Sequence, residues 1–272
     1  MKHLILFSVA ALSLTACRND DDNTSSNNVD VLPVKIESIE DGKSYVYNFK
    51  YDNNKIVELI GEENNITFTY AGDLISGFNG KDGKDIENYA FTYNSNGQLT
   101  SATYTMTEGD GEYTTVGKKS YTYNADGTVT EKDESTSTRK SDPSYLRSSV
   151  TNYTYTLNNG QITKVVEDNP YDISTTNYTY DSKNGIFKNV KGFSNAVLGL
   201  FEYFSDFSSI TQNNFDKMES TTSSKSSNYN NSISYKHTYE YNANNYPTKI
   251  TTEYKYDSTS SSSYTYNITY NK

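Results

Sequence analysis

Aromatic and polar residues alternate in short, similar units along most of the chain. The clearest unit covers residues 121–129, with the sequence Tyr-Thr-Tyr-Asn-Ala-Asp-Gly-Thr-Val, and residues 91–99 repeat its spacing. Alternation with a period of two places both rings on one face of a strand and the threonine on the other. Aromatic and β-branched residues also favour the pleated surface of a sheet. The units therefore predict β-strands with one aromatic face.

A turn follows the aromatic pair in the clearest units. The sequences Asn-Ala-Asp-Gly at 124–127 and Asn-Ser-Asn-Gly at 94–97 predict a type I turn followed by a left-handed glycine, which closes an antiparallel hairpin. An aliphatic residue two positions after the glycine starts the next strand. Most successive units lie roughly 19 to 32 residues apart, a spacing typical of an array. The remaining units begin at Phe49, Phe68, Tyr153, Tyr178, Tyr239 and Tyr264.

Consecutive hairpins predict an all-β fold, an antiparallel meander of about 12 to 16 strands. A long sheet does not stay open with one apolar face in water. We therefore expect it to curl into a barrel or half-barrel, or to form a two-layer sheet. Tyrosine rows would line the interior, with Thr, Ser, Lys and Glu outside. Leu, Ile, Val and Phe total only 51 of the 272 residues, so the core must also draw on the 27 tyrosines.

Three segments depart from this pattern. Apolar residues at helical spacing, from Val197 to Phe204, predict one short helix near 195–204 with Ser194 as its cap. We expect this helix to cover an open end of the sheet, and a plug or ligand gate is the alternative. The Ser- and Asn-rich stretches 221–234 and 258–263 predict long exposed hairpin loops.

The amino terminus has a basic start and an apolar run over residues 4–14, which is too short to span a bilayer. The run ends in Leu-Thr-Ala-Cys at 14–17, which resembles the lipobox of bacterial lipoproteins. The resemblance implies cleavage before Cys17 and acylation of that cysteine. We expect a signal peptide at 1–16, an acidic disordered tether at 17–30 and a single β-repeat domain at 31–272.

Composition argues against a disulfide-stabilised domain and against a nucleic-acid-binding protein. Cys17 is the only cysteine, so the domain can form no internal disulfide. Cleavage removes Lys2 and leaves 23 basic against 34 acidic residues (24 − 1 against 34), a formal charge of −11. Such a chain gains little from counterion release, and we expect no nucleic-acid partner.

The aromatic units resemble two known groups. They are similar to the YD repeat of the Rhs class, roughly Y-x-Y-D-x-x-G-R-L, although Asn124 replaces the aspartate and Thr128 the arginine. The chain is far too short for the closed cocoon of that class. The units also resemble uncharacterised lipoproteins of the Bacteroidota with a porin-like, barrel-resembling fold. That group has no assigned activity, so no catalytic residue is implied.

The second resemblance implies an export signal and a glycosylation site. In that group, acidic residues just after the lipid cysteine act as a surface-export signal, and Asp20, Asp21 and Asp22 occupy that place here. A generic solvated tether is the alternative. The sequence Asp-Ser-Thr at 257–259 resembles the short O-glycosylation motif of the same group, which implies a glycan on Ser258. The expected location is the outer membrane, with a lipid anchor and the domain facing the cell exterior.

The strands themselves do not predict a membrane-spanning barrel. Lipid requires an apolar outer belt, whereas the positions that we expect on the outside are threonines and charged residues. These positions are Thr92, Thr122, Thr154, Thr179, Lys50, Glu131 and Lys164.

The sequence offers little catalytic chemistry. His237 is the only histidine left after cleavage, which allows no common triad or zinc site, and we expect no metal and no cofactor. Carboxylates at 108–112 and 79–85 could act as a glycosidase pair, but both stretches predict flexible glycine-rich hairpin tips. Neither matches the spacing of a calcium loop.

These observations leave three functions open. The first is a non-catalytic, surface-exposed binding or adhesion module for glycan or an envelope partner, since tyrosine rings offer apolar contact together with a hydroxyl. The second is a structural accessory of an outer-membrane complex. The third is a glycan-acting enzyme that uses two carboxylates.

Overall fold

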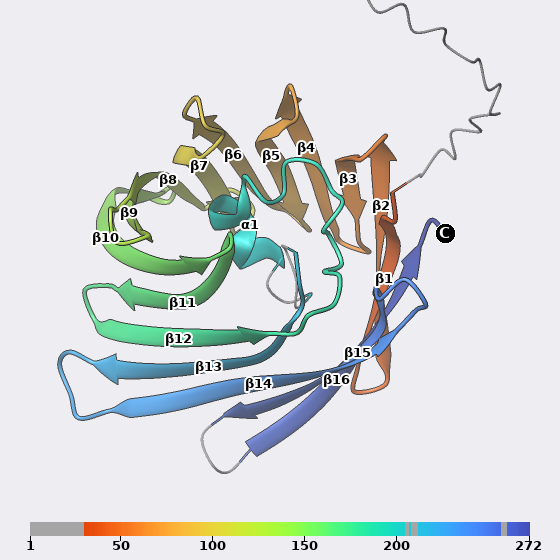
Figure 1. Ribbon diagram of the computed structural model, residues 1–272. Helices are drawn as coiled ribbons and strands as arrows, with labels where there is room; N and C mark the ends of the chain where they lie inside the picture. Colours follow the sequence, from red (N-terminus) through yellow and green to blue (C-terminus); the bar gives the residue numbers. More distant parts are fainter. Residues whose placement is uncertain (1–29, 205–206, 208–211, 257–259) are drawn as a thin grey trace, which may run out of the picture.

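The chain forms a closed antiparallel barrel of sixteen strands around one short helix (Figure 1). The computed structural model describes residues 30–204, 207, 212–256 and 260–272. Each strand pairs with the next, and β1 closes the ring against β16. The predicted all-β meander is confirmed, and of the three predicted shapes it takes the barrel. The strands are β1 Pro33–Glu40, β2 Lys43–Asp52, β3 Lys55–Ile60, β4 Asn64–Ala71, β5 Leu74–Asp82, β6 Asp85–Tyr93, β7 Leu99–Glu108, β8 Tyr113–Tyr123, β9 Thr128–Arg139, β10 Asp142–Asn158, β11 Gln161–Asp168, β12 Asp172–Tyr180, β13 Phe215–Ser224, β14 Asn230–Tyr241, β15 Pro247–Tyr256 and β16 Ser260–Tyr270.

The aromatic units lie where one strand ends and the next begins. In the turn between β6 and β7, the Gly97 amide donates to the Asn94 carbonyl oxygen at 3.0 Å, and Gly97 has a φ of 74°. The turn between β8 and β9 repeats this geometry with Gly127, at a φ of 83°. A residue with a side chain is disfavoured at such angles, which explains the glycine at the end of the motif.

The second tyrosine of several units links its hairpin to the preceding one. The Tyr93 hydroxyl donates to the Ile75 carbonyl oxygen at 2.7 Å, eighteen residues earlier. Tyr180 does the same to Ile162, again at 2.7 Å and eighteen residues apart. Burial raises the pKa of both phenols. The tyrosine row therefore hydrogen-bonds neighbouring hairpins together as well as filling the core.

The described residues of the connection between β12 and β13, 181–204, 207 and 212–214, enter the barrel and are called the plug below. It contains the helix α1, Val197–Phe204, close to the predicted range. The helix begins three residues after Ser194, so Ser194 does not cap it as predicted; the Ala196 carbonyl accepts the Leu200 amide at 2.9 Å. Among the described residues no helix is long and apolar enough to cross a membrane.

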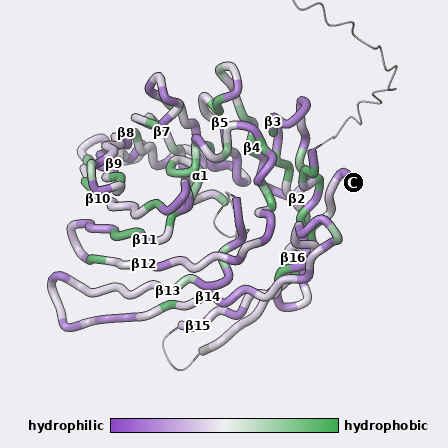
Figure 2. The backbone as a smooth tube through the Cα atoms, in the orientation of Figure 1, coloured by the Kyte–Doolittle hydropathy of each residue, from purple (hydrophilic) through white to green (hydrophobic). Residues whose placement is uncertain are grey.

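Aromatic rings pack the plug against the barrel wall. Phe193 and Phe204 are almost fully buried and both lie against Phe68 of β4, with ring centroids 6.3 and 6.2 Å apart. Phe187 contacts Phe49 of β2 at 5.6 Å. Figure 1 shows α1 inside the ring of strands, and Figure 2 shows hydrophobic stretches gathered around it. The plug therefore forms the centre of the core, which goes beyond the predicted role of a cover.

Hydrogen bonds hold the plug to one rim of the barrel, which we call the plug rim. Lys191 donates its amide to Asn54 and forms an ion pair with Asp73 at 2.9 Å. Asn195 donates to the Gly97 carbonyl, so three successive hairpin turns contact the plug. Both described chain ends lie at the same rim, where Asn189 donates to the Val31 carbonyl at 3.0 Å. The opposite rim, formed by the other set of hairpin turns, is called the far rim.

Two predicted loops are strands instead. Residues 221–224 belong to β13 and residues 230–234 to β14, so only 225–229 connect them. Residues 260–263 of the second predicted loop belong to β16, and 258–259 lie outside the described residues. Serine and threonine serve as strand residues here because their hydroxyls pair across the ladder, as between Ser174 and Thr222 at 2.7 Å.

The outer face of the barrel is polar, with one correction to its expected members. Thr92, Thr122, Thr179, Lys50 and Lys164 are exposed as predicted, and Thr154 is half-buried. Glu131 was expected among them and instead points inward, where it is 1% exposed. The period of two explains this, because Val129 faces the core and the residue two positions later must do so too.

Candidate functional site

A cleft lies between the plug and strands β1 to β6 and β16, on the side of the far rim. It consists of three adjoining pockets of about 310, 230 and 150 Å³. Tyr47 lines the first two pockets, Tyr203 the last two, and Asn64 all three. We call this continuous space the tyrosine cleft.

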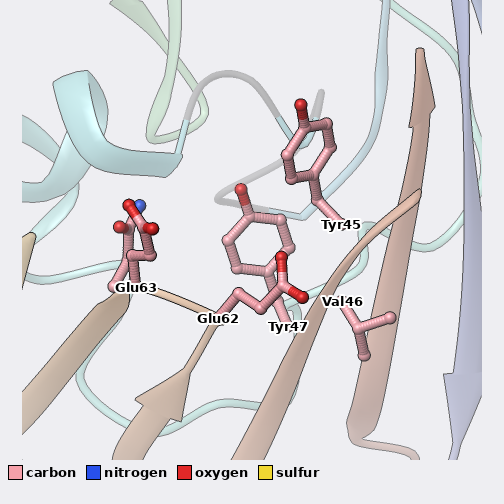
Figure 3. A pocket seen from close by; sticks show the side chains of 6 residues that line it. Tyr45, Val46, Tyr47, Glu62 and Glu63 are labelled. Carbon is pink, nitrogen blue, oxygen red and sulfur yellow. The ribbon is translucent and has the colours of Figure 1, made fainter. Parts of the chain in front are cut away.

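Strand alternation and the plug position the rings of the cleft. Figure 3 shows Tyr45 and Tyr47 projecting from β2 to one side, while Val46 points to the other. The Tyr47 ring meets Phe207 of the plug edge-on at 5.6 Å. Tyr203 reaches the cleft from α1, and its hydroxyl donates to Glu87 at 2.5 Å. Tyr266 of β16 also lines the second pocket, so strands and plug together present four tyrosines to the cleft.

Carboxylates surround these rings. The residues that border the cleft include five acids, Glu62, Glu63, Asp82, Asp85 and Glu87. Burial, with the neighbouring Tyr89 and Glu87, holds the pKa of Tyr203 well above its usual value, so this phenol keeps its proton. Apolar ring faces beside hydrogen-bond acceptors suit a ligand that carries both apolar faces and hydroxyl or amine donors.

A second cluster, of buried charges, lies on the inner face of β8 and β9. Lys119 contacts Glu131 at 3.2 Å and Asp133 at 3.8 Å, and the side chains of Lys119 and Glu131 are 6% and 0% exposed. The Tyr155 hydroxyl donates to Glu131, and that of Tyr104 donates to Asp133, both at 2.9 Å. Burial and the Asp133 charge raise the pKa of Tyr104. Sequence analysis missed this cluster, although the period of two from Val129 could have revealed it.

Glycine makes the reach of Tyr104 possible. A Cβ atom at Gly117 would lie 2.2 Å from the Tyr104 ring carbon Cζ, so the ring lies flat across β8 only because this residue has no side chain. The position pairs with Tyr104 in the ladder and lies between β7 and β9. Gly117 thus determines which carboxylate the phenol can contact.

His237 is a packing residue in the described structure. It is buried between Phe215 and Tyr235, with ring centroids 5.1 and 6.4 Å away, and its Nδ1 lies 2.9 Å from the Thr252 hydroxyl. Burial lowers its pKa to about 4, against a smaller opposing effect of Asp216. Among the described residues, no group of three or more His, Cys, Asp or Glu side chains could hold a metal ion.

The carboxylates predicted as a possible catalytic pair lie at hairpin tips, as expected. Asp110 pairs with Lys84 at 2.8 Å, and Asp85 accepts the Gly109 amide at 2.9 Å. Glu112 binds Arg139 and Ser141, contacts that lower its pKa. Asp110, Asp85 and Glu112 are each held by a local neighbour. Asp82 and Asp85 of the 79–85 stretch both line the last pocket of the tyrosine cleft, where they are cross-strand neighbours on one wall.

Several predicted residues lie outside the described ranges. They are Cys17, Asp20, Asp21, Asp22 and Ser258. The lipid anchor, the export signal and the glycosylation site therefore stay predictions.

Similarity to known proteins is confined to the fold. Neither a protein-family model nor a curated protein matches the chain. A crystal structure of a porin-like protein from Bacteroides vulgatus is 16% identical and aligns over 89% of this chain and 99% of that chain, with a TM-score of 0.54. A porin-like protein from Bacteroides uniformis is 13% identical over 88% and 97% of the two chains, with a TM-score of 0.48. The first of these similarities shows a shared barrel architecture.

Proposed function

We propose that this protein is a lipid-anchored, surface-exposed β-barrel that binds glycan in the tyrosine cleft. The supporting observation is the cleft itself, a continuous space between Tyr45, Tyr47 and Tyr203 with five carboxylates at its border. Aromatic faces stack on the apolar faces of sugar rings, and carboxylates accept hydrogen bonds from sugar hydroxyls. The ring of Tyr47 packs on Phe207 of the plug and Tyr203 is hydrogen-bonded to Glu87, so these two side chains lose less freedom when a ligand binds.

The fold supports an orientation for this display. Residue 30 lies at the plug rim, where its carbonyl accepts the Asn271 side chain at 3.1 Å. A lipid on Cys17 would hold this rim towards the membrane, and the tyrosine cleft lies towards the opposite rim. The polar outer face of the strands favours a barrel that stands in water over one that is embedded in lipid. Release of a Cys17→Ala variant from cell membranes would test the anchor.

The structure favours binding over hydrolysis. Glycosidases of the common kinds need two carboxyl groups held on either side of the scissile bond. In the cleft, Glu62 and Glu63 are exposed and follow one another at the β3–β4 connection, and Glu87 accepts a hydrogen bond from Tyr203. Asp82 and Asp85 are cross-strand neighbours on one wall of the cleft, which is not the arrangement of two carboxyl groups on either side of a bond. All five acids border the cleft.

The experiment compares a tyrosine that lines the cleft with an exposed tyrosine outside it. The full-length protein is screened on a glycan array, and the best neutral oligosaccharide is titrated by calorimetry. Tyr45→Ala removes a ring at the cleft that is 40% exposed, and we expect a loss of affinity of about tenfold, as for one lost stacking contact. Tyr171→Ala, at the β11–β12 connection and 74% exposed, is the matched control and should bind normally.

Two outcomes would contradict glycan binding as the function. One is the absence of glycan binding together with capture of an envelope protein from intact cells, which would favour a structural accessory. The other is turnover of a polysaccharide that a single Asp or Glu substitution abolishes, which would establish an enzyme. Equal losses in Tyr45→Ala and Tyr171→Ala would also show that the cleft is not the site.

A further inference from the structure

Arginine is rare in this chain, and its two described copies lie together. The sequence has only Arg18, Arg139 and Arg147, against many lysines. Arg139 ends β9, and Arg147 lies near the start of β10, in the hairpin that these two strands form. Across that hairpin, Arg147 pairs with Ser137 and Arg139 with Asp142. Both arginines therefore lie towards the far rim.

The register places both arginines on the inner face of the barrel. On β10, Leu146 and Val150 are exposed on the outside, whereas Tyr153 and Tyr155 contact the buried charge cluster inside. Alternation then turns Arg147 inward, as it does its partner Ser137. On β9, Arg139 has the same parity as Glu131 and Asp133, which point inward.

Two tyrosines hold the guanidinium groups in place. The Cζ atom of Arg139 lies 5.4 Å from the Tyr113 ring centroid, and that of Arg147 lies 5.1 Å from the Tyr145 ring centroid. The two rings meet edge-on with centroids 6.0 Å apart. The four side chains therefore form one connected group. A guanidinium stacked on a ring loses less freedom when it binds a ligand.

The two arginines differ in how their charge is matched. The Nε of Arg139 donates to Glu112 at 2.8 Å, and this contact raises the pKa of Arg139. Arg147 is exposed, and no carboxylate among the described residues lies within ion-pair distance of it. Its planar donor fork is therefore available to a ligand.

We infer that Arg147 and Tyr145, with Arg139 and Tyr113 behind them, form a second binding site, for the carboxylate of an acidic saccharide. The guanidinium fork matches a carboxylate with two parallel hydrogen bonds, and the ring beside it offers an apolar face to the sugar. Level with Arg147 on the same wall lie hydroxyls, such as those of its partner Ser137 and of Thr115, with oxygens 2.7 Å apart, which suit the hydroxyls of a sugar.

This site is distinct from the tyrosine cleft and does not rest on the function proposed for it. The cleft is bordered by carboxylates, which repel an anionic group, whereas the arginine site attracts one. The two sites also lie on different strands, β8 to β10 here and β1 to β6 with β16 there. A ligand that carries a carboxylate should therefore prefer the arginine site.

The experiment measures binding of trigalacturonate to the full-length protein by calorimetry, beside a neutral trigalactoside and its sulfated form. We expect trigalacturonate to bind best, and Arg147→Gln to weaken it by at least about tenfold, as for a lost charged hydrogen-bond pair. Arg147→Lys keeps the charge but loses the planar pair of donors, so its affinity for trigalacturonate should be close to that of Arg147→Gln. Lys118→Gln, an exposed residue of β8, changes the net charge equally and should bind as the parent does.

Four results would overturn the inference. They are no binding of trigalacturonate, unchanged affinity in Arg147→Gln, an equal loss in Lys118→Gln, and equal binding of the sulfated and carboxylated forms. Tyr45→Ala, in the tyrosine cleft, should leave trigalacturonate binding unchanged, and a loss there would show that the two sites are not separate. Failure of the neutral glycan to bind would count against the cleft alone.

Discussion

The half of the barrel interior next to the plug differs from the half next to the far rim. Near the plug rim the wall and the plug share an aromatic core, with Phe187, Phe193 and Phe204 almost fully buried. Towards the far rim the same strands carry hydroxyls and charges inward, such as Thr115, Ser137 and Arg147. Both halves are built from one alternating pattern, yet the inward side chains are mainly apolar in one half and include hydroxyls and charges in the other.

This difference separates stability from binding along the barrel axis. The plug half buries apolar surface, which contributes most of the free energy of folding. The far half leaves polar groups available at the inner wall, and both proposed sites lie there. Lys119 and Glu131 lie partway along β8 and β9, and their charges are buried but form an ion pair. Three predictions test this division, from the largest expected effect to the smallest.

Loss of a plug ring should have the largest effect. Phe193→Ala removes a ring that is 1% exposed and contacts three other phenylalanines, so the free energy of unfolding should fall by about 4 kcal/mol. Urea-induced unfolding, followed by circular dichroism, measures this. Tyr171→Ala, on the exposed β11–β12 connection, should change stability by less than about 0.5 kcal/mol. Similar small losses in both variants would mean that the plug does not stabilise the barrel.

Breaking the buried ion cluster should have an intermediate effect. Lys119→Met leaves the Glu131 carboxylate buried without its cation and should cost about 3 kcal/mol of unfolding free energy. Adding Glu131→Gln removes the stranded charge and should recover part of the loss. Lys132→Met breaks an exposed pair with Glu134 and should cost less than about 1 kcal/mol. If the exposed and buried lysines cost the same, the cluster is not buried in solution.

Acidification should have the smallest effect of the three, through His237. Burial lowers its pKa from 6.5 to about 4 in the folded state, so the unfolded state binds a proton more readily. Its contribution to stability is therefore complete above pH 6.5 and is lost as the pH falls towards 4. Between pH 7 and pH 5 we expect a loss of about 2 kcal/mol from this residue.

The control for the histidine is His237→Phe, which keeps a ring beside Phe215 and removes the titration. The difference in pH slope between parent and variant isolates the histidine, whatever the variant's absolute stability. Parallel slopes between pH 7 and pH 5 would show that His237 is solvated in the folded state.

Much of the fold could be predicted because it is local. The alternation around Phe91 and Tyr93 determines which face each residue takes, and Gly97 determines where the chain turns. The helix at 197–204 follows from apolar spacing within a single segment. The failed predictions concern residues whose chemistry is suited to either environment. Ser and Thr in 221–234 look like loop residues until their cross-strand partners are known.

The candidate sites could not be predicted in the same way. Tyr45 and Tyr203 are far apart in the sequence, and they line one cleft only because the plug folds back into the barrel. The sequence does not indicate that Arg139 and Arg147 lie together. Arg139 stacks on Tyr113 of the neighbouring strand β8, and Arg147 stacks on Tyr145 of its own strand β10. Glu131 could have been placed inside from Val129 alone.

The sequence by itself determined the period of the strands, the positions of the glycine turns such as those at Gly97 and Gly127, and the helix at 197–204, because each depends on neighbours within a few residues. Only the tertiary structure decided that β1 pairs with β16, that the plug lies inside the barrel, and how deep each inward residue lies. A period of two states which face a side chain takes and carries no information on what lies opposite. That depends on contacts between distant segments, as when the Tyr70 hydroxyl reaches the Lys191 carbonyl 121 residues away.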